Sequence, residues 1–364
     1  FVMSVKQLYT KNFRNLESQK IALNPELNFV IGDNGSGKSS FLEALFLIGH
    51  GKSFRTIKND TMCCFDSDEF VINVKDESER NFGLSKSKNE AGFTIRQNGQ
   101  SLDKLSQLAK NFAIQIVTPE SFKLFLGGAK ERRKFFDLGL FHVKHQFSSQ
   151  WSVFSKTLKQ RNAGLKLRSR DASREYWTNS FVDLSEQLSE VRAEYCQVFE
   201  AELVKWVGIL LPEVVGDFRL SFYQGWSANK SLKEILEANS DREYKQGFSF
   251  AGAHKYDVKF LVGSMPLELK LSRGQQKLFL LALTFSQTKL IERVKPVKPI
   301  LLIDDIGAEL DLASRTKFER AIQQLDCQIV ITAIDEQALR PLVENNYNNT
   351  MFHVKHGEIS ELSK

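Results

Sequence analysis

The sequence has no long hydrophobic run. No uninterrupted apolar stretch approaches the roughly 20 residues that a membrane-spanning helix needs, and no signal-peptide pattern opens the chain. Cysteine is scarce as well, with four in 364 residues, and the four lie too far apart for a zinc knuckle or a disulfide framework. We therefore expect a cytoplasmic protein without a membrane partner. Because the chain starts with Phe1-Val2, we expect Met3 to be its native start.

A strong charge of one sign is also missing. The chain has 50 Lys and Arg against 44 Asp and Glu, so its formal net charge is +6, which favours a polyanionic partner without requiring one. The pairs His142/His145 and His353/His356 have no cysteine or acidic companions at ligand spacing, so no zinc site is expected. The 29 phenylalanines are better explained as core residues than as a platform for stacked bases.

Hydrophobic patterns divide the chain into three parts. Apolar runs at 27–31 and 112–117, with alternating segments between 69 and 98, predict an α/β arrangement. From about 130 to 210 the pattern is helical, with an apolar seam of 3.5-residue period that ends before Pro212. The seam consists of Trp177, Phe181, Leu184, Leu188, Val191, Tyr195 and Val198. Beyond 245 an α/β pattern returns, so a helical insert interrupts an α/β domain.

A glycine-rich loop follows the first apolar run. It satisfies G-x-x-x-x-G-K-[ST], with a strand before it and a helical stripe after it, a context that a simple helix-capping turn does not require. In such loops backbone N–H groups point at phosphates, Lys38 neutralises phosphate charge and the Ser39 hydroxyl ligates Mg²⁺. The predicted ATP-binding residues are Gly32, Asp33, Asn34, Gly35, Ser36, Gly37, Lys38, Ser39 and Ser40.

A second anion-binding motif lies far downstream. Four residues match the L-S-x-G-Q signature of the ATP-binding-cassette class and lead directly into an apolar helix, whose N-terminal end suits a phosphate. Taken alone, the same residues would also serve as an ordinary helix cap. The predicted signature residues are Ser272, Arg273, Gly274 and Gln275.

Paired carboxylates follow the apolar run at 300–303. Asp304 and Asp305 stand where a Walker B motif places a Mg²⁺ ligand and the base that polarises the attacking water, so with Lys38 they are the predicted catalytic residues, and Ser39 and Asp304 the predicted metal ligands. The stretch "AELD" at 308–311 matches a D-loop, with Glu309 and Asp311. In the cassette class the signature of one chain completes the ATP site of a second chain. One motif set per chain therefore implies a homodimer that ATP closes and hydrolysis opens.

Several stretches resemble, in order along the chain, the motifs of the RecF family. About 230 residues separate the phosphate loop from the signature, which is far more than in transporter cassettes and is typical of the chromosome-maintenance and recombination branch. Two of the matching stretches, around RRKFFD and KQRNA, are not shared by cassette proteins generally. The matching stretches are YTKNFRNL, IGDNGSGKSSFLEAL, GKSFRT, TPESFKLFLGGAKERRKFFD, FSKTLKQRNAGLK, LSRGQQKL and LIDDIGAELD.

The resemblance implies both a fold and a function. The expected fold is an ATP-binding-cassette head of two lobes, formed by 1–115 and 246–364, with a helical arm inserted at 116–245. The expected function is that of an ATP- and Mg²⁺-dependent homodimer, a weak DNA-stimulated ATPase, which binds double-stranded and single-stranded or gapped DNA near junctions. With RecR and RecO, such a protein helps RecA to replace single-strand-binding protein during repair and replication.

The sequence departs from the cassette pattern in three places. The strand before the insert ends in "VTPE", so no γ-phosphate-sensing glutamine is assigned, and Gln115 lies earlier. Thr332 and Ala333 stand where a switch histidine is expected, which motivates the hypothesis of slow, regulatory hydrolysis. In "AGAHKYD" Lys255 replaces the arginine of the family, and lysine is a poorer bidentate donor.

Basic residues of the arm are the predicted DNA contacts. A solvated helix face explains the same charge run equally well. Arg55 stands where related ATPases carry an arginine that reaches DNA or the nucleotide, and Arg14 is expected at the ATP. No base-reading motif is present, so binding should depend on shape and charge. The candidates are Arg55, Lys156, Lys159, Arg161, Lys166, Arg168 and Arg170.

Two other classes of function fit less well. A nuclease-linked or metabolic P-loop enzyme would need a further catalytic cluster, such as an acidic triad, for which no segment of this sequence is available. An architectural condensin-like ATPase would need hundreds of heptad residues, whereas the seam here lasts three heptads.

Overall fold

The computed structural model describes residues 4–56, 58–90, 92–168, 172–294, 298–305, 310–340, 342–346 and 348–362. Two compact units can be distinguished by their contacts. Unit 1 is drawn from Phe1–Ser121, Ile209–Leu211 and Ser272–Lys364, and unit 2 from Phe122–Gly208 and Pro212–Leu271. Each unit is described by itself below.

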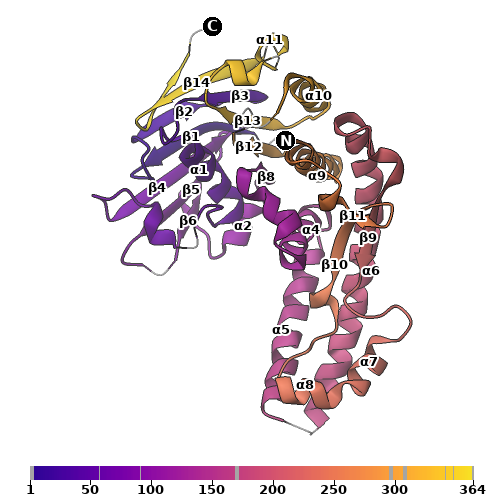
Figure 1. Ribbon diagram of the computed structural model, residues 1–364. Helices are drawn as coiled ribbons and strands as arrows, with labels where there is room; N and C mark the ends of the chain where they lie inside the picture. The colour runs from indigo at the N-terminus through magenta and orange to yellow at the C-terminus, as the bar shows by residue number, and fades with distance from the viewer. Residues whose placement is uncertain are drawn as a thin grey trace. The chain divides into compact units, whose positions relative to one another are not determined.

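Unit 1 contains two sheets (Figure 1). The first is mostly parallel, in the order β15 (Glu358–Glu361), β14 (Asn349–Lys355), β3 (Leu27–Ile31), β13 (Gln328–Ala333), β12 (Ile300–Ile303) and β8 (Ile114–Val117). The second is antiparallel, in the order β2 (Gln19–Ala22), β1 (Val5–Lys11), β4 (Glu69–Asp76), β5 (Asn81–Ser87), β6 (Thr94–Gln97) and β7 (Gln100–Ser101). The helices of unit 1 are α1 (Lys38–His50), α2 (Leu105–Ala109), α9 (Arg273–Val294), α10 (Leu312–Ile322) and α11 (Leu342–Asn345).

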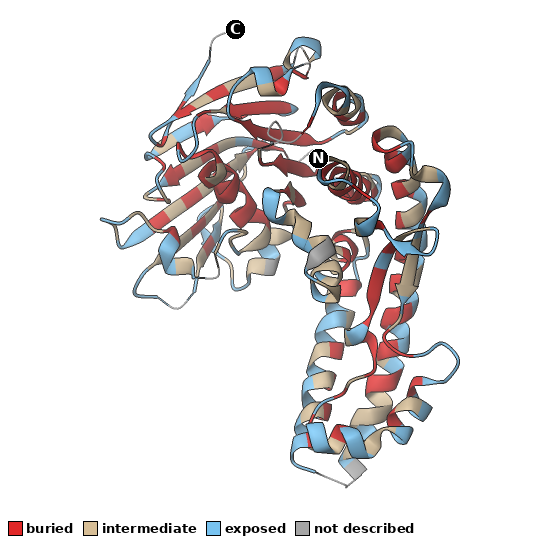
Figure 2. Ribbon diagram, viewed as in Figure 1, coloured by how far each residue is buried: buried red, intermediate tan, exposed pale blue. Residues whose placement is uncertain are grey.

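The main core of unit 1 lies around α1. Residues from both sheets and from α1 form one hydrophobic cluster, so nearly every side of this helix is buried. The strands β12 and β13 are buried along their whole length and β3 over its first four residues, as expected for parallel strands that are covered on both faces (Figure 2). This explains why β3 and β12 appear in the sequence as continuous apolar runs, without alternation.

Unit 2 is mainly helical. Its helices are α3 (Lys123–Leu126), α4 (Ala129–Val143), α5 (Phe147–Lys166), most of α6 (Ala172–Leu210), α7 (Leu232–Ala238) and α8 (Ser240–Gln246). A small antiparallel sheet comprises β9 (Phe218–Tyr223), β10 (Asp257–Val262) and β11 (Met265–Pro266). Phe136 of α4 contacts both Phe199 of α6 and Phe260 of β10. Because β10 packs on these helices, unit 2 extends to Leu271, beyond the residue 245 at which the sequence placed the end of the insert.

The buried seam of α6 differs from the predicted one. Phe181, Leu188 and Tyr195 are buried as expected, but Val198 is 54% exposed, and the seam passes through Ser185 and Arg192 in place of Leu184 and Val191. The period of alternating four and three residues is correct, whereas every second position was displaced by one residue. The reason is that polar residues occupy seam positions, and they pair inside the unit.

Within the described residues no helix combines the length and the apolar character that crossing a membrane requires. The predicted α/β fold with an inserted helical part is confirmed.

Candidate ATP-binding site

The site lies at the carboxyl edge of the parallel sheet of unit 1. Strands β3, β13 and β12 are parallel neighbours, with Ile31 opposite Ala333 and Ile303 opposite Ile331. The segments that leave these three strands therefore meet at one edge, the usual place for ligands in open α/β sheets. This topology brings the glycine loop together with Asp304, Asp305 and Thr332.

The glycine loop has the backbone geometry of a phosphate cradle. Gly37, with φ 126°, precedes the first turn of α1 without a side-chain cap, so that helix end is open to an anion. A Cβ on Gly32 would collide with the carbonyl oxygen of Val354, which is why glycine is required there. Lys38 Nζ donates to the carbonyls of Gly32 and Asp33, the latter at 2.9 Å. The loop thus holds its lysine over the place where phosphates would lie.

Burial lowers the pKa of Lys38 from its ordinary value, and the nearby carboxylates of Asp305, Asp304 and Asp33 oppose that shift. A cation in this position is poorly solvated and attracted to three acids. A polyphosphate is the ligand that compensates such a lysine best.

Hard oxygen donors from two elements converge beside the lysine. Ser39 Oγ lies 3.0 Å from Asp304 Oδ2 and 3.3 Å from Asp304 Oδ1, although 265 residues separate them in sequence. Hydroxyl and carboxylate oxygens with room for water are the donor set that Mg²⁺ prefers, so these residues fit a Mg²⁺ ion that accompanies ATP. The two residues predicted as metal ligands are therefore neighbours.

Thr332 occupies the place of the expected switch histidine and organises both carboxylates. Its Oγ1 donates to Asp304 Oδ1 at 2.7 Å and accepts from the backbone N–H of Asp305 at 2.9 Å. Asp305 has a left-handed backbone (φ 51°), and its Oδ1 is buried without a hydrogen-bond partner among the described residues. Asp305 is thus held by its backbone, while one buried carboxylate oxygen has no partner among the described residues.

Arg14 and Arg55 converge on one buried acid that the sequence analysis did not single out. Glu43 of α1 is fully buried, and Arg14 donates to its two carboxylate oxygens at 2.9 and 2.7 Å. Arg55 lies 3.4 Å from Glu43 Oε2, and Ser53 also donates to this carboxylate. An acid in the middle of the apolar run "SFLEALFLIG" was the signal that could have revealed it.

A second missed residue is Asn15. Its Nδ2 donates to the carbonyl of Gly35 at 3.1 Å, and its Oδ1 accepts from Ser40 Oγ at 2.8 Å. Asn15 therefore ties the segment after β1 to the glycine loop. Together with Arg14 it explains why the stretch "NFRNL" accompanies a phosphate loop.

The loop, the carboxylates and the arginines enclose one cavity of about 490 Å³. It is large enough for a nucleotide. The lining residues are Arg14, Asn15, Asn34, Gly35, Gly37, Lys38, Ser39, Ser40, Arg55, Thr61, Cys63, Pro119, Asp304 and Asp305. Arg55 is thus placed at the nucleotide cavity, which favours the nucleotide over DNA as its ligand.

Gln115 is not part of this cavity. It lies within β8, opposite Leu301, two residues before the end of the strand, and is buried with an Nε2 that no described residue accepts from. A side chain inside the sheet cannot reach the carboxyl edge.

The signature residues form the exposed start of α9. Ser272 Oγ accepts from the N–H of Gln275 at 3.3 Å, and Gln275 Oε1 accepts from the N–H of Ser272 at 3.0 Å, which is a reciprocal capping box. Ser272 and Arg273 are exposed, and Gly274 is half-buried. Among the described residues that line the ATP cavity, none belongs to 272–275. The structure therefore does not bring the signature into the cavity of its own chain.

Asp311 of the predicted D-loop caps a helix. Its Oδ1 accepts from the N–H of Ser314 at 2.8 Å at the start of α10, and hydrogen bonds from the side chain and then the backbone of Ser314 hold the pKa of Asp311 below its usual value. Glu309 lies outside the described residues.

The predicted DNA contacts on unit 2 fall into different environments. Lys156, Lys159, Lys166 and Arg168 are exposed, whereas Arg170 lies outside the described residues. Arg161 is only 6% exposed. The prediction that Arg161 contacts DNA at the surface is therefore wrong.

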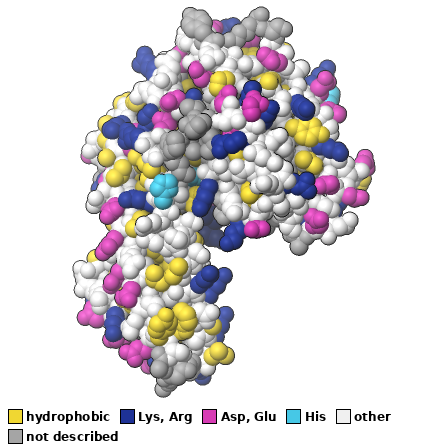
Figure 3. Space-filling model, turned by 180° about the vertical axis from the view of Figure 1, so that it is seen from behind, with side chains coloured by type: hydrophobic (Ala, Val, Ile, Leu, Met, Phe, Trp, Pro, Cys, Tyr) yellow, Lys and Arg dark blue, Asp and Glu magenta, His cyan; other side chains and the backbone are white. Residues whose placement is uncertain are grey.

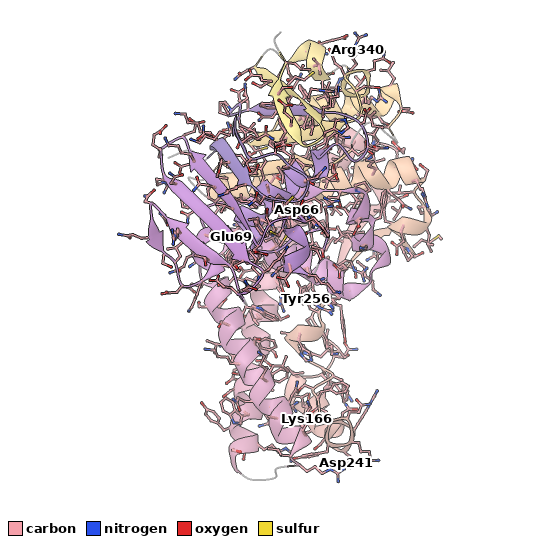
Figure 4. All side chains as sticks on the ribbon, turned by 90° about the vertical axis from the view of Figure 1, so that its left-hand side faces the viewer. Asp66, Glu69, Lys166, Asp241, Tyr256 and Arg340 are labelled. Atoms are coloured by element: carbon pink, nitrogen blue, oxygen red, sulfur yellow. The ribbon has the colours of Figure 1, made fainter. Side chains whose placement is uncertain are left out.

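Arg161 instead belongs to a buried network in unit 2. It donates to Glu243 Oε2 at 2.5 Å and to Ser249 Oγ, and its guanidinium lies over the ring of Phe181. The arginine of the KQRNA stretch therefore belongs to the core of unit 2. In Figure 4, Lys166 and Asp241 mark one end of unit 2 and Tyr256 lies toward the other.

Ion pairs and hydrogen bonds connect the RRKFFD stretch to the AHKYD stretch. Arg132 makes a bidentate pair with Asp257 at 2.8 and 2.9 Å. Arg133 donates to the carbonyl of Tyr256 at 2.9 Å, and the hydroxyl of Tyr256 donates to Asp137 at 2.8 Å. The two stretches are therefore structural partners in unit 2. Lys255, at the position of the family's arginine, lies near the Phe248 ring instead.

The fold and the site together define a class. A parallel sheet carries a phosphate loop and a Walker B carboxylate pair at one edge, and a capped signature helix lies between these two motifs in the sequence and in the same unit. This is the head of an ATPase of the ATP-binding-cassette and SMC-like type. Comparison with known proteins gives the family within that class.

A family model described as the RecF/RecN/SMC N-terminal domain matches residues 4–359. The chain is 53% identical to the DNA replication and repair protein RecF of Colwellia psychrerythraea, over 98% of this chain and 97% of that protein. It is 36% identical to the protein of the same description from Haemophilus influenzae, over 99% and 100%. The chain belongs to the RecF family of DNA replication and repair proteins.

Solved structures agree on the fold. The chain matches a structure described as the recombination mediator protein RecF-ATP in the RecFOR pathway with a TM-score of 0.84 and 23% identity, covering 100% of this chain and 98% of the other. It matches an Smc head bound to the C-terminal winged-helix domain of ScpA with a TM-score of 0.58 and 14% identity, covering 99% and 97%. At these identities the matches show the fold alone.

Proposed function

We propose that this protein is an ATP-dependent, DNA-binding recombination mediator. The carrying observation is that Ser39 Oγ lies 3.0 Å from the Asp304 carboxylate, next to Lys38, in a chain that is 53% identical over nearly its full length to a RecF protein. Mg²⁺ would supply charge neutralisation between the phosphates. Lys38 and the N-terminal end of α1 bind the phosphates, and Asp305 orients and deprotonates the attacking water.

We further propose that ATP is bound between two copies of the chain. Ser272 and Arg273 of the signature are exposed, and no signature residue belongs to the described lining of its own cavity, although the signature forms a helix start of the kind that binds anions. The arrangement that uses both features places Ser272 of one protomer on the phosphates held by Lys38 of its partner. A γ-phosphate that contacts both chains favours the closed dimer, and its loss favours opening.

The proposed ligand of the closed dimer is gapped or junction DNA. Exposed lysines of α5 support this proposal, since α5 contains no acidic residue and its exposed Lys156, Lys159 and Lys166 make no ion pair with described residues. In the lower part of Figure 3, Lys and Arg side chains gather along one edge of unit 2 and Asp and Glu along the opposite edge. We infer that RecR and RecO act with this protein to promote RecA loading, and that slow hydrolysis sets when DNA is released.

A mixing experiment tests the composite site. Lys38→Arg damages the phosphate loop and Ser272→Arg blocks the signature, so each variant alone should have little ATPase activity. In a mixed dimer one site carries both defects and the other is intact, so ATP-dependent dimers should form in an equal mixture and not in either variant alone. If each chain used its own signature, no mixed species would contain an intact site, and a mixture that forms no ATP-dependent dimer would contradict the proposal.

A further inference from the structure

A lysine of the signature helix contacts the catalytic carboxylate segment of the same chain. Lys277 lies in the second turn of α9, five residues after Ser272, and is only 5% exposed. Its Nζ donates to the backbone carbonyl of Asp305 at 2.9 Å. Burial of an ammonium group is unfavourable unless the group has a hydrogen-bond partner. The carbonyl of Asp305 is such a partner for Lys277.

The backbone of Asp305 is therefore held from two sides. Its N–H donates to Thr332 Oγ1 at 2.9 Å on β13, and its carbonyl accepts from Lys277 on α9. Between these contacts the residue has φ 51°, a left-handed conformation that is uncommon outside glycine but that Asp adopts more often than most residues. The two contacts fix the backbone in this conformation. Removing either contact should release the segment and move the Asp305 carboxylate.

α9 connects this contact to the signature. Arg273 at the start of α9 is exposed and the rest of its first turn is half-buried, whereas the helix is buried from Lys277 to Thr288. Five residues of helix span about 8 Å along the axis, so Ser272 and Lys277 belong to one rigid segment. A shift of the exposed tip is transmitted to Lys277, since a continuous helix does not absorb it within one turn and a half.

We propose that Lys277 is a positioning residue that couples the two ATP sites of the dimer. This inference rests on the proposed composite site. When Ser272 of one protomer engages the nucleotide held by its partner, α9 moves as a unit. Lys277 then sets the position of Asp305 in the protomer's own site. Occupation of one site thereby controls the geometry of the base at the other.

The coupling predicts cooperative hydrolysis. A base that reaches its productive position only when the opposite site is filled gives a rate that rises more steeply than hyperbolically with ATP concentration. Without Lys277 the two sites should act independently. The effect on turnover comes from misplacing the base, which costs roughly tenfold to a hundredfold for displacements of about 1 Å.

Lys277→Met is the test variant, since it keeps the length of the side chain and removes the donor. We expect ATP binding and ATP-dependent dimerisation to stay within about twofold of wild type, kcat to fall at least tenfold, and the Hill coefficient of hydrolysis to fall from above 1 to 1. Lys277→Arg restores a donor and should restore part of both kcat and cooperativity. Thermal melting of the ATP-free protein separates a folding defect from this pattern.

Two controls make the result specific. Lys289 lies on the same helix and donates to Glu292 and to the carbonyl of Gln324, away from the cavity, so Lys289→Met should leave kcat and the Hill coefficient unchanged. Thr332→Val removes the other contact to Asp305 together with the hydrogen bond to Asp304, and neither of these contacts involves α9, so it should lower kcat and keep the Hill coefficient above 1.

Three results would overturn the inference. They are a wild-type Hill coefficient of 1, an unchanged Hill coefficient in Lys277→Met, or equal loss of cooperativity in Thr332→Val and Lys277→Met. Failure of the composite site itself is distinguishable by ATP-dependent dimerisation, which does not need a correctly placed base, in the mixture of Lys38→Arg with Ser272→Arg, in which Lys277 is intact.

Discussion

Among single residues, Glu43 has an unusual position for a carboxylate. Its side chain is fully buried on α1, one and a half turns after Lys38, and its two oxygens accept from Arg14, with Arg55 and Ser53 close by. Arg14 and Arg55 both line the ATP cavity. Glu43 therefore balances the charge of two arginines that would otherwise repel each other beside the phosphates.

Glu43→Gln should destabilise the protein and weaken ATP binding. The amide cannot balance the two guanidinium groups, and breaking a buried ion pair from one side costs about 3 kcal/mol. The loss should be visible in the urea midpoint of the ATP-free protein, and nucleotide titration should show weaker binding.

Glu79→Gln is the matched control for this substitution. Glu79 pairs with Lys6 and Lys75 on the surface, where solvent screens the charges, so the unfolding free energy should be nearly unchanged. Equal destabilisation by the two substitutions would show that burial of Glu43 carries no special weight.

The residues of the ATP site differ in how far the sequence could reveal them. Lys38, Ser39, Asp304 and Asp305 belong to motifs whose spacing is dictated by phosphate and metal geometry, so they are visible in any chain that contains them. The sequence distinguished Thr332 only as the residue that stands where a switch histidine is expected. Its role depends on the register of β12 and β13, which places Thr332 next to Asp304 and which no local pattern encodes.

At the scale of elements, α6 shows why a correct period can give wrong positions. The buried seam of this 39-residue helix includes Arg192, which is 1% exposed. Its guanidinium pairs with Asp137 at 3.1 Å and lies 3.8 Å from the centroid of the Tyr256 ring. A prediction that places only apolar residues in the seam must skip Arg192 and choose Val191. Long-range pairing between α4, α6 and the segment before β10 decided the outcome.

The element whose charge bears on function is α5. Its exposed lysines are the described cations most suited to a DNA backbone, since Arg161 of the same helix is committed to Glu243. For gapped DNA, the slope of log Kobs against log salt is negative. Lys156→Glu combined with Lys159→Glu should reduce its magnitude by about 2, since each neutralised phosphate contributes about 1. Fluorescence anisotropy at several salt concentrations measures this slope.

The control pair for α5 is Lys144→Glu with Lys205→Glu. Both lysines belong to unit 2, and they pair with Glu194 and Glu202 respectively. The net charge change equals that of the α5 pair, so an effect of overall charge would appear in both. An unchanged salt slope in the α5 variant, or equal slopes in the two variants, would remove α5 from the DNA interface.

For the whole molecule, the ATP site and the DNA site are proposed to be linked by hydrolysis. The link requires that the dimer stays closed on DNA while ATP is intact. It also requires that the dimer opens once ATP has been hydrolysed with Asp305 as the base. The orphaned Oδ1 of Asp305 in the ATP cavity is consistent with a carboxylate kept free for that water. Asp305→Asn keeps the shape of the side chain and removes the proposed base.

Asp305→Asn should therefore trap the protein on DNA. Loss of a general base lowers turnover by about 100-fold or more, while Lys38, Ser39 and Asp304 still bind Mg·ATP, so closure should proceed. In stopped-flow experiments with labelled gapped DNA and ATP, dissociation should slow to the rate that wild-type protein shows with a non-hydrolysable analogue. Asp326→Asn, at an exposed carboxylate outside the ATP cavity, should dissociate like wild type. If Asp305→Asn hydrolyses slowly but leaves DNA as fast as wild type, the release of DNA is not timed by hydrolysis, and the affinity of the dimer for DNA must be set by another step.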